Sequence, residues 1–308
     1  MNKKMHWDKL ADCEFARSLY PWLRLLMVCA AGITLLSGCV QIIPGPPQAP
    51  PGVLSGREEL KKHNVARARQ QFDAAIGKDR TNRLTYIAIM QSCLETGQQG
   101  LVVDYFRQAE AALAKTKGEE RAQFYVAASI YLESAGDGLD SVRACEEAYR
   151  LLPQAWETQN ALGYTYAQSG KNLERAIELT TSAIKKAREE RIPDKELGII
   201  VDSLGWAYYR NEQLAEAVRT LSSAADLSPD QPEVLYHLGV AYFDSGDYKD
   251  AKISLTRAKA GTLDAKNMDP VALAKLQTAI EQQTKKVEEK LALAKPAPAQ
   301  NAPGPGGQ

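Results

Sequence analysis

The sequence predicts an all-α fold in which about six helix pairs stack in a row and one final helix closes the stack. Two observations lead to this prediction. The heptapeptide LGWAYYR (Leu204–Arg210) returns 34 residues later as LGVAYFD (Leu238–Asp244), and a looser copy, LGYTYAQ, begins upstream at Leu162. Self-similarity at such a period is typical of a repeat array, in which each unit buries its apolar flanks against the next unit.

The two clearest copies align at a constant spacing of 34 residues. The aligned pairs are Leu204 and Leu238, Gly205 and Gly239, Tyr208 and Tyr242, Ala217 and Ala251, Leu221 and Leu255, and Ala224 and Ala258. Leu, Gly and Tyr at this spacing mark one face of a helix. The small residues let a neighbouring helix come close, although Gly lowers helix propensity. The pattern resembles the tetratricopeptide repeat (TPR), which implies a right-handed superhelix, an α-solenoid with a concave wall.

The other copies are weaker, and we expect them, in chain order, at residues 49–82, 83–116, 121–155 and 156–197. The copy at 49–82 shows chiefly its second helix, through Ala68, Phe72 and Ala75. After residue 265 the period stops. Asp269-Pro270 then predicts a helix start, and residues 270–294 predict one long helix with an apolar stripe and a polar back. Such a helix is the cap that the end of a solenoid needs.

The first 39 residues carry a targeting pattern. Scattered Lys and Arg residues precede the apolar run Leu25–Leu36, which is too short to span a bilayer. Leu36-Ser37-Gly38-Cys39 resembles the lipobox of bacterial lipoproteins. The resemblance implies that residues 1–38 are a removed signal peptide and that Cys39 is lipidated. Because residue 40 is Val rather than Asp, it also implies a periplasm-facing anchor in the outer membrane. The alternatives are an uncleaved anchor or a chance match.

Composition divides the remaining chain into three parts. Residues 39–53 contain five prolines and predict a lipidated, Pro-rich tether. Residues 54–295 predict the TPR solenoid with its cap helix. Residues 296–308 contain Pro, Gly and Ala without an apolar period, so we expect a disordered tail.

Charge and motifs narrow the class of protein. Lys+Arg and Asp+Glu both number 38, which argues against a nucleic-acid partner. We find no metal-binding, nucleotide-binding or nucleophile motif, so we predict no catalytic residues, no metal, no cofactor and no small-molecule substrate. His63 and His237 are isolated, and we expect surface or groove positions for them. Cys93 and Cys145 fit small core residues, with a disulfide as the alternative.

The TPR resemblance implies which side chains line the concave wall. Carried over position by position, the candidates for a partner-binding groove are Tyr125, Asn160, Tyr164, Trp206, Tyr209, Arg210, Tyr236 and Phe243. The same positions include Gln168, Asp202 and Asp244. Aromatic side chains combine a large contact area with a polar handle, which suits peptide binding. The alternative is that these rings pack between repeats.

These patterns predict a membrane-anchored scaffold that holds a protein or peptide partner in the periplasm. Lipoproteins of similar build assist pilus biogenesis or the assembly of a secretin ring, and this analogy supplies one expected role. The alternative is an adaptor for peptidoglycan enzymes or for polysaccharide export. An enzyme would need converging ionisable groups in a cleft, and the sequence contains no such set.

Overall fold

The computed structural model describes residues 49–265 and 268–293. This part of the chain is helical throughout and contains no strand. The helices, in chain order, are α2 (Pro51–Lys61), α3 (Val65–Lys78), α4 (Arg83–Glu95), α5 (Gln99–Leu113), α6 (Gly118–Ala135), α7 (Gly138–Leu151), α8 (Trp156–Ser169), α9 (Leu173–Glu189), α10 (Asp194–Arg210), α11 (Leu214–Leu227), α12 (Pro232–Asp244), α13 (Tyr248–Asp264) and α14 (Pro270–Leu293).

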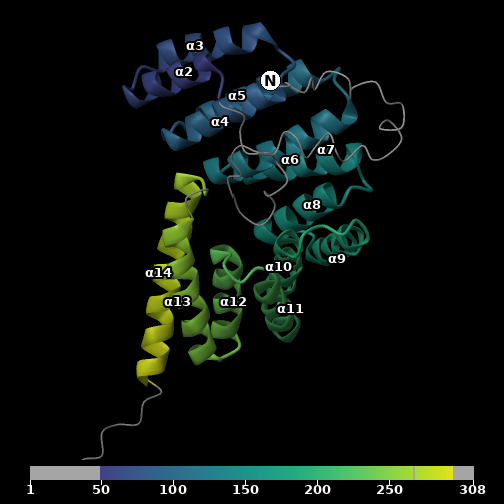
Figure 1. Cartoon of the computed structure of the whole chain (residues 1–308), viewed down its shortest axis with the longest axis vertical. Helices are drawn as coiled ribbons and strands as arrows, with labels where there is room; N and C mark the ends of the chain where they lie inside the picture. The colour runs from purple at the N-terminus through teal and green to yellow at the C-terminus, as the bar shows by residue number, and fades with distance from the viewer. Residues whose placement is uncertain (1–48, 266–267, 294–308) are drawn as a thin grey trace, which may run out of the picture.

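Consecutive helices form six pairs, from α2 with α3 to α12 with α13, and the pairs follow one another along a curved stack (Figure 1). The predicted all-α solenoid with a C-terminal helix is therefore confirmed. The first pair is more complete than its sequence suggests. Helix α2 begins at Pro51, inside the segment predicted as tether, and Val53 is fully buried.

Close contact between the two helices of a pair explains the repeated glycine. A Cβ atom added to Gly205 would lie 2.6 Å from Leu221 Cγ, and one added to Gly239 would lie 2.7 Å from Leu255 Cγ. Both leucines are completely buried. The glycine on the first helix thus makes room for the leucine on the second, and the repeated sequence letters encode this packing.

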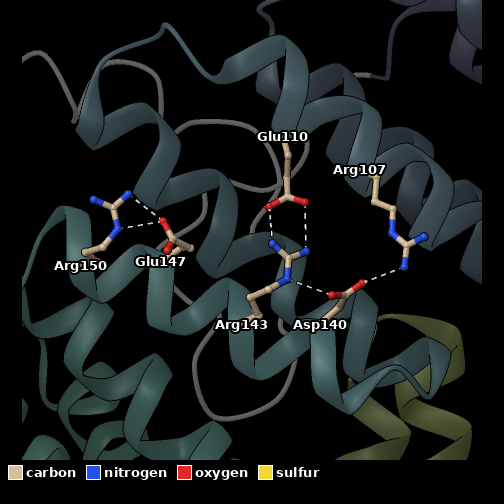
Figure 2. Close-up of polar contacts among 6 residues, drawn as sticks. All are labelled: Arg107, Glu110, Asp140, Arg143, Glu147 and Arg150. Carbon is tan, nitrogen blue, oxygen red and sulfur yellow. Dashed lines mark hydrogen bonds and ion pairs between the residues drawn. The ribbon is translucent and has the colours of Figure 1, made fainter.

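Ion pairs join the second helices of neighbouring pairs, as Figure 2 shows for α5 and α7. Glu110 accepts two hydrogen bonds from the Arg143 guanidinium, at 2.7 and 3.0 Å. The same guanidinium contacts Asp140 and lies 5.2 Å from the centre of the Phe106 ring. Arg107 forms a longer ion pair with Asp140, at 3.6 Å. These partly exposed charges hold two successive repeats in register.

Helix α14 does more than cover the last pair. Its second half packs on α13, where Val287 is fully buried against Ala251 and Leu255. Its start reaches far back along the chain, because Lys275 Nζ donates to the Ser134 carbonyl of α6 at 2.8 Å. Figure 1 shows the start of α14 beside the end of α6. The predicted cap helix therefore also bridges the sixth pair to the earlier ones.

The remaining predictions divide into those that the structure describes and those that lie elsewhere. Cys93 and Cys145 are buried free thiols, so the core interpretation is confirmed, and burial raises the pKa of Cys93 to about 12. Within the described residues, no helix has the length and apolarity needed to cross a bilayer. The signal peptide at 1–38, Cys39 and the tail at 296–308 lie outside the described residues.

Candidate functional site

The first helices of the pairs line one side of the solenoid. We call the surface formed by α4, α6, α8, α10 and α12 the inner wall. Across repeats, the backbones of these helices approach one another more closely than those of α5, α7, α9 and α11 do. A stack whose first helices are closer together curves toward them. The inner wall is therefore the concave side on which the groove was predicted.

The structure divides the eight predicted groove residues into two sets. Tyr125, Asn160, Tyr164 and Trp206 are buried, with 3 to 9% of their surface exposed. Tyr209, Arg210, Tyr236 and Phe243 are partly exposed. The first set packs inside the wall, as the alternative interpretation expected. The second set forms a surface that a partner can touch, and we call it the α10–α12 patch.

A stack of aromatic rings supports the α10–α12 patch from behind. Trp206 stacks on Tyr209 with ring centres 4.7 Å apart, and on His237 with ring centres 4.2 Å apart. Tyr236 lies against the far side of the stack, 5.8 Å from the His237 ring. Because two of these rings come from α10 and two from α12, the stack fixes the fifth and sixth first helices relative to each other.

Hydrogen bonds extend this support to α8 through Gln168. Trp206 Nε1 donates to Gln168 Oε1 at 3.1 Å, and Gln168 Nε2 donates to the Tyr164 hydroxyl. Arg210 donates from Nη1 to the Gln168 carbonyl at 2.8 Å. On the other side, the Tyr209 hydroxyl donates to Asp244 Oδ2. The patch is therefore held in place before any partner arrives.

His237 and Asp202 form a buried pair that sequence reasoning placed wrongly. His237 was expected at a surface or groove position and Asp202 on the wall, yet 3% and 0% of their surfaces are exposed. His237 Nδ1 lies 2.9 and 3.0 Å from the two carboxylate oxygens. Burial alone lowers the pKa of His237, but the Asp202 carboxylate outweighs it and holds this pKa above its usual value. Each side chain satisfies the other, which makes burial of both tolerable.

One signal could have revealed this pair. Asp202 and His237 stand 35 residues apart, one position beyond the repeat period, and both lie on first helices. A carboxylate and a histidine at nearly the repeat spacing can meet across neighbouring first helices. His63, in contrast, is exposed in the turn between α2 and α3, as expected. Among the residues that the structure describes, no three His, Cys, Asp or Glu side chains cluster as a metal site would require.

A small hollow of about 80 Å³ opens beside Gln168, between α6, α7 and α8. Its lining is mostly hydroxyl and small apolar side chains, together with Glu133, Tyr164 and Gln168. The volume is far below the 300–1,000 Å³ of a typical small-molecule site.

The earlier part of the inner wall is covered by the chain itself. Met268 and Asp269 are buried, with 6% and 2% of their surfaces exposed. Val271 and Ala272 pack against the core cluster formed mostly by α2–α9. The concave side is thus not open along its whole length, and the partly exposed patch lies on α10 and α12.

One segment of the chain, around α11 and α12, matches a known protein family. Residues 205–246 match the TPR repeat family. This segment runs from the second half of α10 through α11 to the end of α12, and it contains most of the α10–α12 patch. TPR repeats build scaffolds that are typical of protein–protein interaction, with the concave side as the usual binding surface. No curated protein is significantly similar in sequence to this chain.

Several solved structures resemble the chain. The APC/C hetero-tetramer Cut9–Hcn1 has a TM-score of 0.49 and 16% identity, and the match covers 74% of this chain and 42% of that one. BtubC from P. vanneervenii has a TM-score of 0.48 and 13% identity, with 82% and 95% covered. A TPR protein from Parabacteroides merdae has a TM-score of 0.46 and 14% identity, with 75% and 97% covered. At these scores the function must be argued from this chain's own residues.

Proposed function

We propose that this protein is a scaffold that holds a protein partner on the α10–α12 patch. The observation that carries the proposal is the patch itself. Tyr209, Arg210, Tyr236 and Phe243 are partly exposed. The aromatic stack and Gln168 hold the first three from behind, and the Phe243 ring lies 5.5 Å from the ring of Tyr248 on α13. Aromatic side chains lose little conformational entropy on binding. Trp, Tyr and Arg are enriched among the residues that dominate the energetics of interfaces.

The charges of the patch favour one kind of partner segment. Asp244 already accepts the Tyr209 hydroxyl, whereas the Arg210 guanidinium carries five N–H donors and uses one for Gln168. A peptide that presents an acidic side chain next to an apolar one would pair with Arg210 and cover Phe243. The partner in this proposal is such a segment of a protein.

Site-specific photo-crosslinking in intact cells tests the proposal. A photoreactive residue at Phe243 should capture a defined partner, because this position faces the patch. The same residue at Leu139, which is 75% exposed on α7, provides the matched control. A product that appears at position 243 and not at 139 supports the proposal. Identical products from both positions would show that the patch has no special role.

A lipid anchor at Cys39 belongs to the same proposal. It is supported by the lipobox letters and by the Pro-rich segment that leads from Cys39 to α2. Two or more acyl chains give lasting membrane attachment, whereas a single chain gives marginal binding. Cys39→Ala should release the protein from the membrane fraction, and Cys13→Ala should leave it there. If the Cys39→Ala protein stays in the membrane fraction, the proposal of a lipid anchor at Cys39 is wrong.

We further propose that the partner belongs to a pilus or secretin assembly, on the analogy of lipoproteins with a similar build. A deletion strain distinguishes this role from the cell-wall alternative. Loss of piliation with normal cell shape supports the pilus role. Altered cell shape or septation with normal pili would instead support a role as an adaptor for peptidoglycan enzymes.

A further inference from the structure

The two halves of α14 serve two different sites. From Ile280 onward the helix is anchored in the last pairs, where Ile280 and Val287 are almost completely buried. The segment Met268–Lys275, which we call the clasp, instead meets α4 and α6, more than a hundred residues earlier in the chain. A helix needs only the first anchor to cap a solenoid. The second contact therefore requires its own explanation.

The clasp is a helix start with a defined chemistry. Asp269 Oδ1 accepts hydrogen bonds from the backbone N–H groups of Val271 and Ala272, at 2.9 and 3.0 Å. These two small apolar side chains then lie against the core cluster of the earlier repeats. Lys275, less than two turns from the cap, donates to the exposed carbonyl at the end of α6. The clasp therefore consists of an acidic N-cap, a short apolar stretch and a lysine.

The electrostatic surroundings of Asp269 oppose this contact. Asp269 is almost completely buried, yet its Oδ2 atom has no hydrogen-bond partner within the described part of the chain. Glu95 faces the same place and is paired with Arg57 at 3.1 Å. Burial raises the pKa of Glu95, and the nearby Asp269 carboxylate adds to this shift. A buried carboxylate oxygen without a hydrogen-bond partner in the described residues, beside a second carboxylate, costs free energy and lowers the stability of the clasp contact.

We propose that the inner wall of α4 and α6 is a second docking site, which takes the start of a partner helix with the chemistry of the clasp. Helix α14 occupies this site in cis, and a partner helix that offers a better-satisfied cap replaces it. Release of the clasp uncovers the α4 and α6 surface next to the hollow beside Gln168. This inference concerns a different surface from the α10–α12 patch and does not depend on it.

Peptide binding in trans tests the second site. The probe is a fluorescent peptide of residues 268–282, added to three versions of the full chain. The wild type should bind it poorly, because a tethered segment competes at an effective concentration in the millimolar range. Val271→Asp with Lys275→Ala should release the clasp and bind the peptide at least about tenfold more tightly. Lys290→Ala with Leu293→Asp makes matched changes at the exposed far end of α14 and should behave as wild type.

Two further measurements keep the outcome clear. Lys275→Ala alone changes an exposed side chain and removes one hydrogen bond, so it should increase binding by about fivefold. The same probe carrying Val271→Asp should not bind any chain. Circular dichroism must show normal helicity for every variant. Equal binding by wild type and the release variant, or no binding by the release variant at about 1 mM peptide, would overturn the proposal.

Discussion

At the residue scale, each position of the wall is set by the side chain that the neighbouring helix places against it. Gly205 and Leu221 could be paired from the repeat alone, because their spacing is the same in the next copy. Asp202 and His237 were placed wrongly, since periodicity identifies the faces of a helix without saying which face a neighbouring repeat covers. Trp206 was likewise predicted on the open wall, but it is buried because the His237 ring of the next first helix stacks on it.

The His237–Asp202 pair predicts a pH dependence of stability. The folded-state pKa of His237 is raised, so its contribution is fully present below the unfolded-state pKa of about 6.5 and is lost as pH rises through the folded value. Urea midpoints of the wild type should fall between about pH 6 and pH 9 by more than those of His237→Leu. His63→Leu, at an exposed position, serves as control and should keep the wild-type profile. A wild-type profile in the His237→Leu protein would contradict the assignment.

Removal of the same side chain also tests its pairing. His237→Leu leaves the Asp202 carboxylate buried without its partner, so it should lower the free energy of unfolding by about 3–5 kcal/mol near neutral pH. The double variant His237→Leu with Asp202→Leu removes both charges and should recover part of this loss. If the double variant loses as much unfolding free energy as the two single variants together, or more, the two residues are not a compensating pair.

At the element scale, helices and their pairing followed from the sequence, whereas the reach of α14 did not. The letters around Asp269-Pro270 predicted a helix start correctly. Whether that start meets α4 and α6 depends on the small rotation between successive pairs, summed over the whole stack. No single repeat contains that information. The exposure of Tyr209 and Phe243 and the burial of Tyr164 depend on the same curvature.

Close packing within a pair predicts opposite effects for two glycines. Gly205→Ala places a methyl group against Leu221 and should lower the free energy of unfolding by about 1–3 kcal/mol. Gly77→Ala, near the end of α3, meets nothing within 4 Å and should be neutral or stabilising. Chemical denaturation of both variants measures the difference. Equal effects would mean that the repeated glycine has no packing role.

The ion pairs between second helices predict a smaller difference. Arg143→Ala breaks the contacts of α7 with Glu110 and Phe106 on α5, and should cost about 1 kcal/mol. Arg150→Ala removes only a solvent-screened pair with Glu147 inside α7 and should cost clearly less than Arg143→Ala. Thermal unfolding in low and high salt compares them. If Arg150→Ala is the more damaging change, the link between repeats is not what stabilises this region.

At the scale of the whole molecule, the described residues form a curved stack of helix pairs, in which the clasp connects the C-terminal helix to α4 and α6 and the α10–α12 patch stays partly exposed. The stack explains why the same seven letters recur, because each copy supplies one packing unit of the wall. The patch appears at the last two pairs, where the wall is not covered by the start of α14. The central claim is that a protein partner binds there.

Titration of the crosslinked partner, once purified, tests this claim most directly. Arg210→Glu with Phe243→Ala changes two partly exposed side chains of the patch, and Arg219→Glu with Ile253→Ala makes the same chemical changes on the exposed second helices α11 and α13. Calorimetry should show at least about tenfold weaker binding for the patch variant and wild-type binding for the control, with unchanged helicity in both. Equal affinity of the patch variant and the wild type would contradict the account.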